Sequence, residues 1–592
     1  MAAAIASLFL APCNTSSPLQ TGFAFAHDTV TQGGLCVTFD ATLGYNAPLT
    51  LAPCVPAAPA QAWQLVGSFL QNPPASCGGL NGACISWSGQ EFGACTFTPP
   101  ALGAGCIIGS WPTSENGAWN SALAPDSPAP GMIQALHSTP SSTPPSGLCV
   151  AAVPPAPPPP PPRPTADVLA WSKKEVMCLY DIDMCVYSGS PQGCNCADAP
   201  PPASAWAPTH LDTDSWVAAG ASAGCKIHIL VAKHMCGFLA WNSTAGQELG
   251  YNYSTAYAAS PVDVVAPFVR SVRAAGGGLG MYYSLTNNAR TKTCAGVVQP
   301  NPAPGQIGVT PAQYDALVAA HLRELWGNYG ALDEAWFDGG FSPSQQAFVT
   351  SLLLELQPHA VAFNGGRISP NPTRWIGSES GFAPADTWST CDLDGSGAGS
   401  PDAATWYPAE TDFTVLQSDS WFFNPAMPVR TPAQLRAMYE QSVGHNTQAL
   451  IGLAIPPNAT MVGTQQAAAL AGLGAFVAGC YGAPVAASSG PGPLLTVMPS
   501  APVAIDRVSA SEDQAGGQLV RAWVLTATLQ DGSTAVLGEG RSIGNKRIVV
   551  LPSPLTVASV TLNITGAAGP AVSISQLAIF SCDSLARRLD GE

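Results

Sequence analysis

The sequence predicts a multidomain protein built around a central (β/α) TIM-like barrel over residues 166–485. Four features of the sequence carry this prediction. Short strands recur in residues 1–150, a polyproline linker follows at 151–165, and strands then alternate with helices. From residue 486 onward short strands follow one another without helices. A chain of 592 residues has room for several such domains.

The N-terminal region, 1–150, contains an internal repeat. Leu-Ala-Pro-Cys at 10–13 returns at 51–54, and Gly-x-Cys-Val/Ile stands at 34–37, 82–85 and 147–150. Threefold recurrence of short strands after an aromatic residue predicts a β-repeat fold. These signatures resemble, in degenerate form, a ricin-B-type β-trefoil. The resemblance implies sugar binding, with a spacer that lacks lectin activity as the alternative. Because the chain opens inside a repeat, we expect its natural start, with any signal peptide, to lie before residue 1.

The linker at 151–165 is dominated by proline, with six in a row at 157–162. Such a run forms an extended polyproline II spacer and cannot pack into a core. It therefore marks a domain boundary.

Strands and helices alternate beyond the linker. Apolar strands are expected at 226–232, 279–285, 334–338 and 360–364. One helix-start signal, Ser/Thr-Pro followed by Asp or Gln at the third helical position, begins at Ser260, Thr310, Ser342 and Thr431. Such repeated capping boxes between strands predict a parallel sheet, and a (β/α) barrel fits about 330 residues best. A doubly wound sheet is the alternative, although no glycine-rich phosphate loop follows any strand.

The C-terminal region, 486–592, is predicted to be an antiparallel β-sandwich. Strands are expected at 519–529, 534–537, 547–551, 557–564 and 573–580. Asp531-Gly532 is a strong hairpin signal between the first two.

Charge and composition exclude several classes of partner. The net charge of −16 argues against nucleic acid and anionic membranes, because both would repel the protein. No apolar run reaches the roughly 18 residues of a membrane span. The sequence contains no phosphate loop and no three-ligand cluster, so we expect no cofactor and no metal. The oligomeric state is left open.

Eighteen cysteines and five Asn-x-Ser/Thr sequons indicate an oxidising compartment. The spacing favours disulfides over zinc sites, including at the Cys194-Asn195-Cys196 segment. We expect a secreted protein, in the extracellular space or cell wall, or one delivered to a vacuole or lysosome. Eight of the cysteines precede the linker: Cys13, Cys36, Cys54, Cys77, Cys84, Cys95, Cys106 and Cys149.

Two carboxylates stand where barrel active sites form. Asp338 ends the predicted strand in Ala-Trp-Phe-Asp-Gly-Gly, and Glu379 follows Arg374-Trp375. Two carboxylates framed by aromatic rings suit glycoside hydrolysis, in which one attacks or activates and the other protonates the leaving oxygen. A turn aspartate and a solvated loop glutamate are the alternatives, and Glu410 is the substitute if Glu379 stands apart.

The chain from about residue 170 to 582 is similar to glycoside hydrolase family 29 α-L-fucosidases of the plant-like branch. The similarity rests on WFDG at 336–339, RWIGSE at 374–379, SVGHN at 442–446 and GEGRSIGNKRI at 538–548. It implies a barrel followed by a sandwich, a fucosylated oligosaccharide or polysaccharide as substrate, and a retaining mechanism. Asp338 would be the nucleophile and Glu379 the acid/base. Substrate contacts would come from Asp181, His234, Tyr283, Trp336, Arg374 and Trp375.

The chain departs from the family pattern at several sugar contacts. Asp181 stands where the family has a histidine, and Met235-Cys236 replaces a second histidine and an aspartate. The family's E-W-G segment has no clear counterpart, and Trp421-Phe422-Phe423-Asn424 lacks its histidine. Three lost hydroxyl contacts at about 1–3 kcal/mol each would slow turnover by orders of magnitude. Two alternatives follow: a lectin-like protein on a fucosidase scaffold, and a glycosidase of another specificity. Cys236 is expected to join a disulfide.

Overall fold

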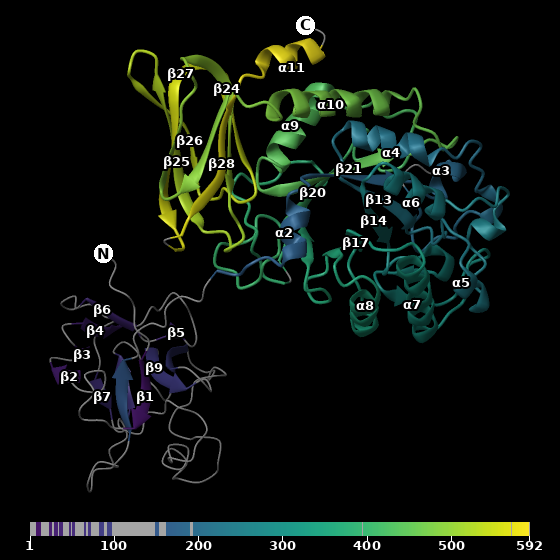
Figure 1. Ribbon diagram of the computed structural model, residues 1–592. Helices are drawn as coiled ribbons and strands as arrows, with labels where there is room; N and C mark the ends of the chain where they lie inside the picture. Colours follow the sequence, from purple (N-terminus) through teal and green to yellow (C-terminus); the bar gives the residue numbers. More distant parts are fainter. Residues whose placement is uncertain are drawn as a thin grey trace, which may run out of the picture. The chain divides into compact units, whose positions relative to one another are not determined.

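The computed structural model describes residues 161–189, 193–393, 395–569 and 571–590 in full (Figure 1). The chain divides into two compact units, Met1–Pro160 and Pro161–Glu592. Of the first unit, only the backbone of its strands is described, and these pair antiparallel. The predicted trefoil, the linker up to residue 160 and the pairing of the N-terminal cysteines lie outside the described residues. The strands are β1 (Leu8–Pro12), β2 (Phe23–Ala26), β3 (Thr29–Gln32), β4 (Leu35–Thr38), β5 (Ala47–Pro48), β6 (Thr50–Pro53), β7 (Gln64–Val66), β8 (Phe69–Asn72), β9 (Gly82–Trp87), β10 (Phe92–Phe97) and β11 (Leu148–Ala152).

The second unit opens with a closed barrel of parallel strands, which confirms the predicted barrel. Strand β12 pairs with both β13 and β21, so the sheet has no free edge. In order around the barrel, the strands are β12 (Val176–Asp181), β13 (Ile227–Lys233), β14 (Gly278–Tyr283), β17 (Glu334–Trp336), β18 (Val361–Phe363), β19 (Pro372–Trp375), β20 (Ala409–Thr414) and β21 (Thr447–Ala454).

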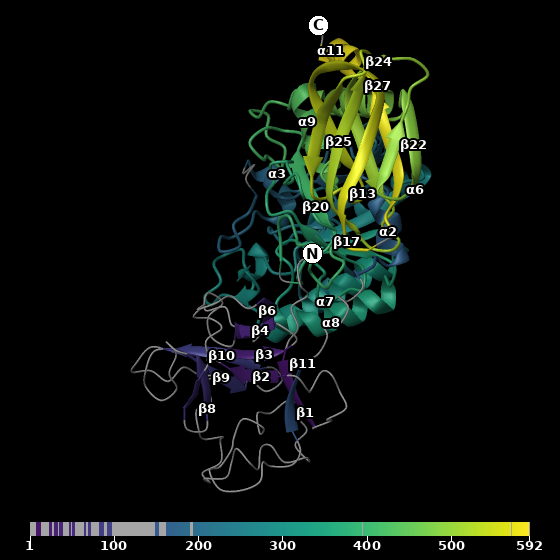
Figure 2. The same ribbon diagram turned by 90° about the vertical axis from the view of Figure 1, so that its left-hand side faces the viewer.

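Helices cover the barrel unevenly. α7 and α8 lie side by side outside β14 and β17 (Figures 1 and 2), whereas no helix separates β18, β19 and β20 among the described residues. A long loop, 376–408, joins β19 to β20 in place of a helix. The helices are α2 (Ala166–Ser172), α3 (Cys185–Ser188), η4 (Ala203–Ala205), α4 (Thr213–Ser222), α5 (Thr244–Glu248), η5 (Thr255–Tyr257), α6 (Val265–Ala274), η6 (Ala289–Thr291), α7 (Pro311–Gly327), α8 (Pro343–Leu356), α9 (Pro432–Ser442) and α10 (Gln465–Tyr481), with a small hairpin of β15 (Thr293–Cys294) and β16 (Val297–Val298).

Three of the four predicted helix starts are confirmed. Thr310, Ser342 and Thr431 each form a capping box with a glutamine three residues on. The fourth prediction, a start at Ser260, is wrong: the Val262 amide donates to the Ser260 carbonyl in a turn, and α6 begins only at Val265. Asp263, two residues before α6, still bonds to the first turn of this helix, because its Oδ1 accepts from the Ala266 amide at 3.0 Å.

The C-terminal region forms one antiparallel sheet around a single apolar core, which includes Val508, Trp523, Leu562 and Leu577. The predicted hairpin at Asp531-Gly532 joins β25 to β26. The strands are β22 (Ala486–Pro491), β23 (Leu494–Val497), β24 (Val503–Glu512), β25 (Val520–Leu529), β26 (Thr534–Gly540), β27 (Arg547–Ala567) and β28 (Ser573–Phe580), followed by α11 (Asp583–Asp590).

The two strands expected at 547–551 and 557–564 are in fact one strand, β27. Pro552 and Pro554 lie where the pairing with β24 shifts register between Val550 and Leu555. A proline lacks an amide hydrogen and is tolerated at such an irregularity. The strand therefore continues and pairs first with β24, then with β23 and β25.

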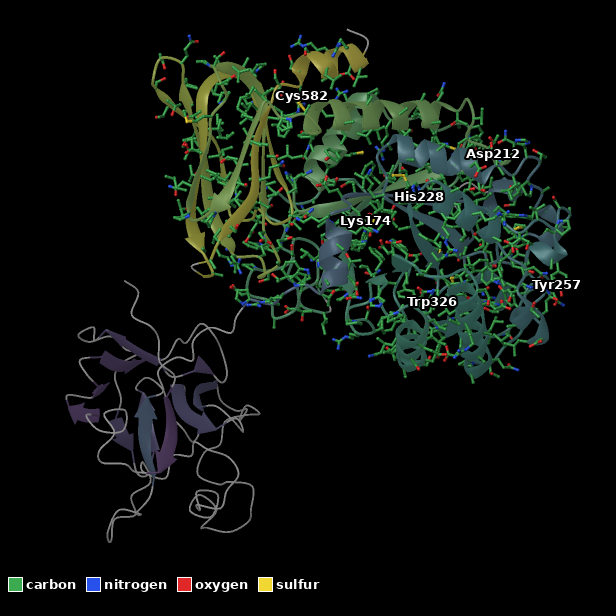
Figure 3. All side chains as sticks on the ribbon, viewed as in Figure 1. Lys174, Asp212, His228, Tyr257, Trp326 and Cys582 are labelled. Carbon is green, nitrogen blue, oxygen red and sulfur yellow. A yellow bond between two sulfur atoms is a disulfide. The ribbon has the colours of Figure 1, made fainter. Side chains whose placement is uncertain are left out.

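Buried polar contacts hold the sheet against the barrel. Arg507 of β24 forms a 2.6 Å ion pair with Glu440 of α9, and Tyr481 donates to the same carboxylate. A disulfide between Cys480 and Cys582 joins the end of α10 to the segment after β28 (Figure 3). Three further disulfides lie in the barrel: Cys178–Cys225, Cys194–Cys236 and Cys196–Cys294. The predicted disulfides of the Cys194-Asn195-Cys196 segment and of Cys236 are confirmed. Among the described helices, none has the length and apolar character needed to cross a membrane.

Candidate active site

Asp338 lies just beyond β17, at the carboxyl end of the fourth barrel strand, and its side chain is 36% exposed. The Tyr282 hydroxyl, from the neighbouring strand, donates to its Oδ2 at 2.6 Å. Burial, followed by the charge of Asp338, raises the pKa of Tyr282 well above its ordinary value. Tyr282 therefore keeps its proton and holds one carboxylate oxygen of Asp338, while the side chain stays accessible.

His234 lies between two carboxylates at this mouth. Its Nδ1 is 3.6 Å from Asp183 Oδ2, and its Nε2 is 4.0 Å from Asp338 Oδ2. Tyr282 stacks on its ring and Phe422 packs edge-on against it. The imidazole is thus fixed in place beside Asp338, within reach of a sugar hydroxyl.

Lys233 closes the base of the same cluster. It is buried, and its Nζ donates to the carbonyls of Ser284 and Asn287 at 2.5 Å each. Burial lowers the pKa of Lys233 to about 7, although Asp183 and Asp338 oppose that shift. Its role is to hold the loop after β14 next to Asp338.

Trp336 forms the floor of the mouth. It stacks on Phe363 with ring centroids 4.0 Å apart and on Tyr282 at 5.0 Å. Its indole Nε1 donates to Glu410 Oε1 at 2.8 Å. Glu410 is fully buried beneath this ring, so it is not placed to protonate a leaving group as the substitute acid.

A second carboxyl group, Glu334, lies against Glu410 inside the barrel. The two share a hydrogen bond, and Trp171 of α2 donates to Glu334 Oε2 at 2.9 Å. Burial raises the pKa of Glu334 to about 7 and, together with Glu334, raises that of Glu410 well above its ordinary value. At least one proton therefore stays on this pair near neutral pH.

Trp375 lines the mouth from β19. Its indole Nε1 donates to Asp412 Oδ1 at 2.8 Å. Burial raises the pKa of Asp412 well above its ordinary value, although the bond from Trp375 opposes the shift. The pair orients the Trp375 ring, which is only partly buried and presents a face for stacking.

Glu379 is exposed in the loop after β19, and its Oε2 accepts from the Trp421 indole at 2.9 Å. Trp421 also lies against the end of β12: a methyl group added at Gly452 would meet both its ring and Asp181 Oδ2. Asp181 is 3% exposed, and its Oδ2 has no hydrogen-bond partner. Burial, followed by the charge of Glu379, raises the pKa of Asp181 well above its ordinary value.

Two predicted substrate contacts do not belong to this mouth. Tyr283 follows Tyr282 in β14 and points to the outside of the barrel, where its hydroxyl bonds His321 Nδ1 at 2.8 Å. Arg374 is 1% exposed and donates to the carbonyls of Trp388, Tyr407 and Gly397. Its guanidinium braces the 376–408 segment.

Four residues that the sequence did not single out as substrate contacts also lie at the mouth: Tyr282, Asp183, Asp412 and Trp421. Strand alternation gives the signal for one of them, Asp412. Counting by twos from Glu334 through Trp336 reaches Asp338, and the same step from Glu410 reaches Asp412. Tyr282 and Tyr283 could not be told apart in this way, because both faces of β14 are apolar and buried.

Comparison with known proteins shows which family this barrel resembles. Residues 196–480 match the family model described as alpha-L-fucosidase. These residues belong to the α-L-fucosidase family, glycoside hydrolase family 29. Alpha-L-fucosidase 1 of Arabidopsis thaliana is 30% identical over 276 residues, which are 44% of this chain and 50% of the relative. Putative alpha-L-fucosidase 1 of Oryza sativa subsp. japonica is 30% identical over 275 residues, 43% of this chain and 48% of the relative. The chain thus spans about half the length of the curated relatives it matches.

Solved structures of the family share the fold. A putative α-L-fucosidase from Bacteroides thetaiotaomicron superposes with a TM-score of 0.63 at 24% identity, covering 71% of this chain and 99% of that one. A family 29 fucosidase from Ruminococcus gnavus, solved in complex with fucose, superposes with a TM-score of 0.61 at 19% identity, covering 72% and 97%. At these identities the similarity establishes the fucosidase-family fold of barrel and C-terminal sheet.

Proposed function

We propose that this protein is a retaining α-L-fucosidase that removes terminal fucose from glycans or polysaccharides. One observation carries the proposal. In a fucosidase-family barrel, Asp338 lies at the carboxyl end of a strand, accessible to substrate, with one oxygen held by Tyr282. Active sites of such barrels form at this end of the strands.

In the first step Asp338 attacks the anomeric carbon, and Glu379 protonates the departing oxygen. A covalent fucosyl-enzyme forms as the glycosidic bond breaks. In the second step Glu379 takes a proton from water, the water attacks the same carbon, and Asp338 is released. Exposure leaves Glu379 free to exchange protons, and Trp421 restrains its position.

The sugar itself would be held by side chains that the barrel brings to one mouth. Trp336 and Trp375 offer aromatic faces for its C–H groups, and His234 offers a ring nitrogen for a hydroxyl. Asp181 stays protonated at pH values at which an ordinary aspartate is charged, because its pKa is raised, and its carboxyl group therefore offers a hydrogen-bond donor.

The test compares wild-type protein with Asp338→Asn and Glu379→Ala on an aryl α-L-fucoside, with exposed Glu355→Gln as a surface control. We expect turnover by the wild type and the control, none by Asp338→Asn, and rescue of Glu379→Ala by azide as fucosyl azide of retained configuration. NMR of the first-formed fucose anomer reads the stereochemistry directly. Inversion would remove Asp338 from its role as nucleophile. A wild type that binds fucose but never turns over would instead be the lectin-like protein.

We further propose that the protein works in an oxidising compartment, secreted to the extracellular space or cell wall or delivered to a vacuole or lysosome. The four disulfides of the described region support this, since cytosolic thiols are kept reduced. Immunodetection in cell fractions tests it, and a strictly cytosolic protein would contradict it.

A further inference from the structure

The outer face of the C-terminal sheet has features that the proposed catalysis does not use. Four strands form this face and pair in the order β26, β25, the stretch 557–567 of β27, and β23. In Figure 1, β25 and β26 lie on the side of the sheet away from α9 and α10. Side chains alternate along a strand, so residues opposite one another in paired strands share a face. The pairing therefore shows which side chains point to solvent together.

Two large apolar side chains stand on this face in solvent. Leu494 is 61% exposed and Val536 is 68% exposed. Val536 lies opposite Thr526, and Thr526 lies opposite Thr561 of β27. Thr561 in turn lies opposite Thr496, which is two residues from Leu494. Exposed apolar surface gathered on one face is a liability for aggregation unless a further group covers it.

Asn563 lies between two apolar residues of the same face. It is opposite Leu494 of β23 on one side and opposite Val524 of β25 on the other. Asparagine is depleted in strands. The Asn563 side chain is exposed, and it forms no hydrogen bond with any other described residue. The strand therefore gains no contact from Asn563 that accounts for an amide at this position.

Asn563-Ile564-Thr565 is an acceptor sequence for N-linked glycosylation. Asn563 and Thr565 are exposed, whereas Ile564 between them is buried in the core of the sheet. A bulky group on the Asn563 amide would thus project into solvent and displace no core side chain. The acceptor sequence at Asn242 differs, because Asn242 Oδ1 already accepts from Gln247 Nε2 at 2.6 Å.

We propose that Asn563 carries an N-linked glycan whose first N-acetylglucosamine lies against Leu494 and Val524. The C–H groups of a pyranose are apolar, and contact with the two aliphatic side chains removes apolar surface from water. The inference goes beyond the proposed catalysis. It rests on the proposed oxidising compartment, because N-linked glycans are added in the secretory pathway.

The modification is a group transfer from an oligosaccharide carried on a lipid pyrophosphate. The side-chain nitrogen of Asn563 bonds to C1 of the first N-acetylglucosamine, while the bond from C1 to the pyrophosphate oxygen breaks. The nitrogen gives up one of its two protons to solvent, and the lipid pyrophosphate leaves. No oxidant or reductant takes part.

The first measurement identifies the modified asparagines. Full-length protein is immunoprecipitated from the cells that make it, and its glycopeptides are analysed by mass spectrometry. We expect a glycan that begins with N-acetylglucosamine on Asn563. An unmodified Asn563 in a chain modified at another acceptor sequence would overturn the inference and leave the proposed compartment standing. A chain without any glycan would also overturn the inference, and the cell fractionation described above then decides whether the compartment fails with it.

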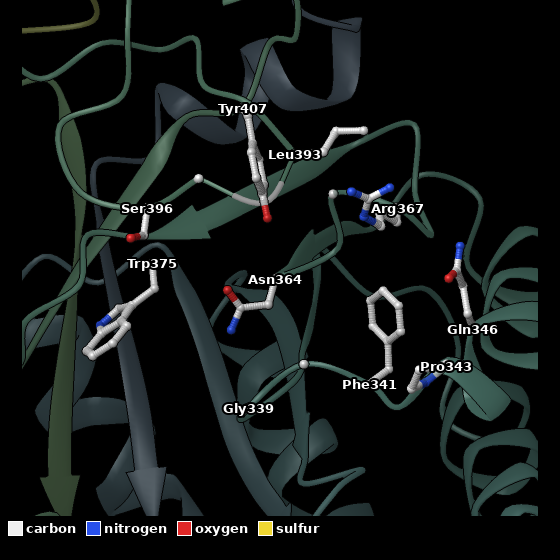
Figure 4. A pocket seen from close by; sticks show the side chains of 13 residues that line it. Gly339, Phe341, Pro343, Gln346, Asn364, Arg367, Trp375, Leu393, Ser396 and Tyr407 are labelled. Carbon is white, nitrogen blue, oxygen red and sulfur yellow. The ribbon is translucent and has the colours of Figure 1, made fainter. Parts of the chain in front are cut away.

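The second measurement asks whether the glycan covers the face. Full-length variants are secreted from eukaryotic cells with a secretion leader added. Thr565→Ala removes the acceptor sequence, Thr565→Ser keeps it, and Thr561→Ala is the matched control on the same face. The described residues that line the cavity next to Asp338 all belong to the barrel (Figure 4), so these variants leave the candidate active site intact.

We expect Thr565→Ala to lose the glycan, to bind more of the hydrophobic dye ANS and to aggregate faster on heating. Thr565→Ser and Thr561→Ala should match the wild type. Leu494→Ser added to Thr565→Ala should return dye binding toward the wild-type level, because it removes apolar surface that the glycan would cover. Equal dye binding and aggregation by wild type and Thr565→Ala, with circular dichroism showing both folded, would overturn the contact with Leu494 and Val524.

Discussion

Replacing Glu334 by glutamine should weaken the dependence of the free energy of unfolding on pH. Glu334 is fully buried, and its pKa is raised to about 7 from an ordinary value of 4.5. Between these two pH values the native protein keeps a proton that the unfolded chain has released. The sign is therefore fixed: stability is full below pH 4.5 and is lost as the pH rises through 7.

The size of the effect follows from the same two values. At 1.36 kcal/mol for each pH unit, the loss between pH 4.5 and 7 is about 3 kcal/mol. Glu410 loses stability in the same window, because burial and Glu334 raise its pKa well above its ordinary value, but wild type and variant share that loss and it largely cancels in their difference. Glutamine preserves the shape and can still accept from Trp171, while Glu410 keeps a hydrogen-bonding neighbour. The variant should therefore be the more stable protein above pH 7.

Thermal unfolding of wild type and Glu334→Gln at pH 5, 6, 7 and 8 measures this difference. For a barrel of about 320 residues, 3 kcal/mol corresponds to a rise in Tm of about 3–5 °C at pH 8, shrinking toward pH 5. Exposed Glu355→Gln serves as the control, since that carboxylate forms only a surface pair with Arg323. Parallel Tm curves for wild type and Glu334→Gln across this range would refute the assignment of a buried proton to the pair.

Two further predictions concern the site and the link between the domains. Tyr282→Phe removes the hydroxyl that donates to Asp338 Oδ2. A hydrogen bond to a charged group is worth about 1.5–3 kcal/mol, so kcat/KM on an aryl α-L-fucoside should fall about 10- to 150-fold. Unchanged kinetics would show that the bond does not assist catalysis. Cys480→Ala with Cys582→Ala opens a loop closed over 102 residues, which should lower stability by about 4–5 kcal/mol. Equal Tm values for this double variant and the wild type would contradict that estimate.

The barrel was predictable because the signals that start its helices lie within a few neighbouring residues. Thr310, Ser342 and Thr431 satisfy their own capping boxes within four residues, so each signal works without tertiary contacts. The failure at Ser260 has a local cause too, since a turn there delays α6 until Val265. The division of β27 into two predicted strands has a tertiary cause, because its prolines lie at a register shift against β24. Whether a proline ends a strand depends on which strand pairs opposite it, and that is decided by the tertiary structure.

The residues of the candidate site were predictable only where their spacing along a strand decides which face of the barrel their side chains occupy. Asp338 and Trp336 share the inner face of β17 because they are two residues apart. Tyr283 was named from the family resemblance, and the sequence of β14 has no polar side that would have indicated Tyr282 instead. The bracing role of Arg374 depends on carbonyls from the 376–408 loop, and no periodicity in the sequence places that loop.

The departures from the family pattern keep more of the site's chemistry than the sequence indicated. Asp181 replaces a histidine, yet burial and the charge of Glu379 raise its pKa, so its carboxyl group can donate a hydrogen bond as a protonated ring would. Cys236 replaces an acidic residue and instead ties the segment after β13 to Cys194. Phe422, in the segment that lacks its histidine, packs against His234 and fixes that ring beside Asp338. Because each substitution supplies a donor, a tether or a wall, the mouth remains an ordered site around the accessible carboxylate of Asp338.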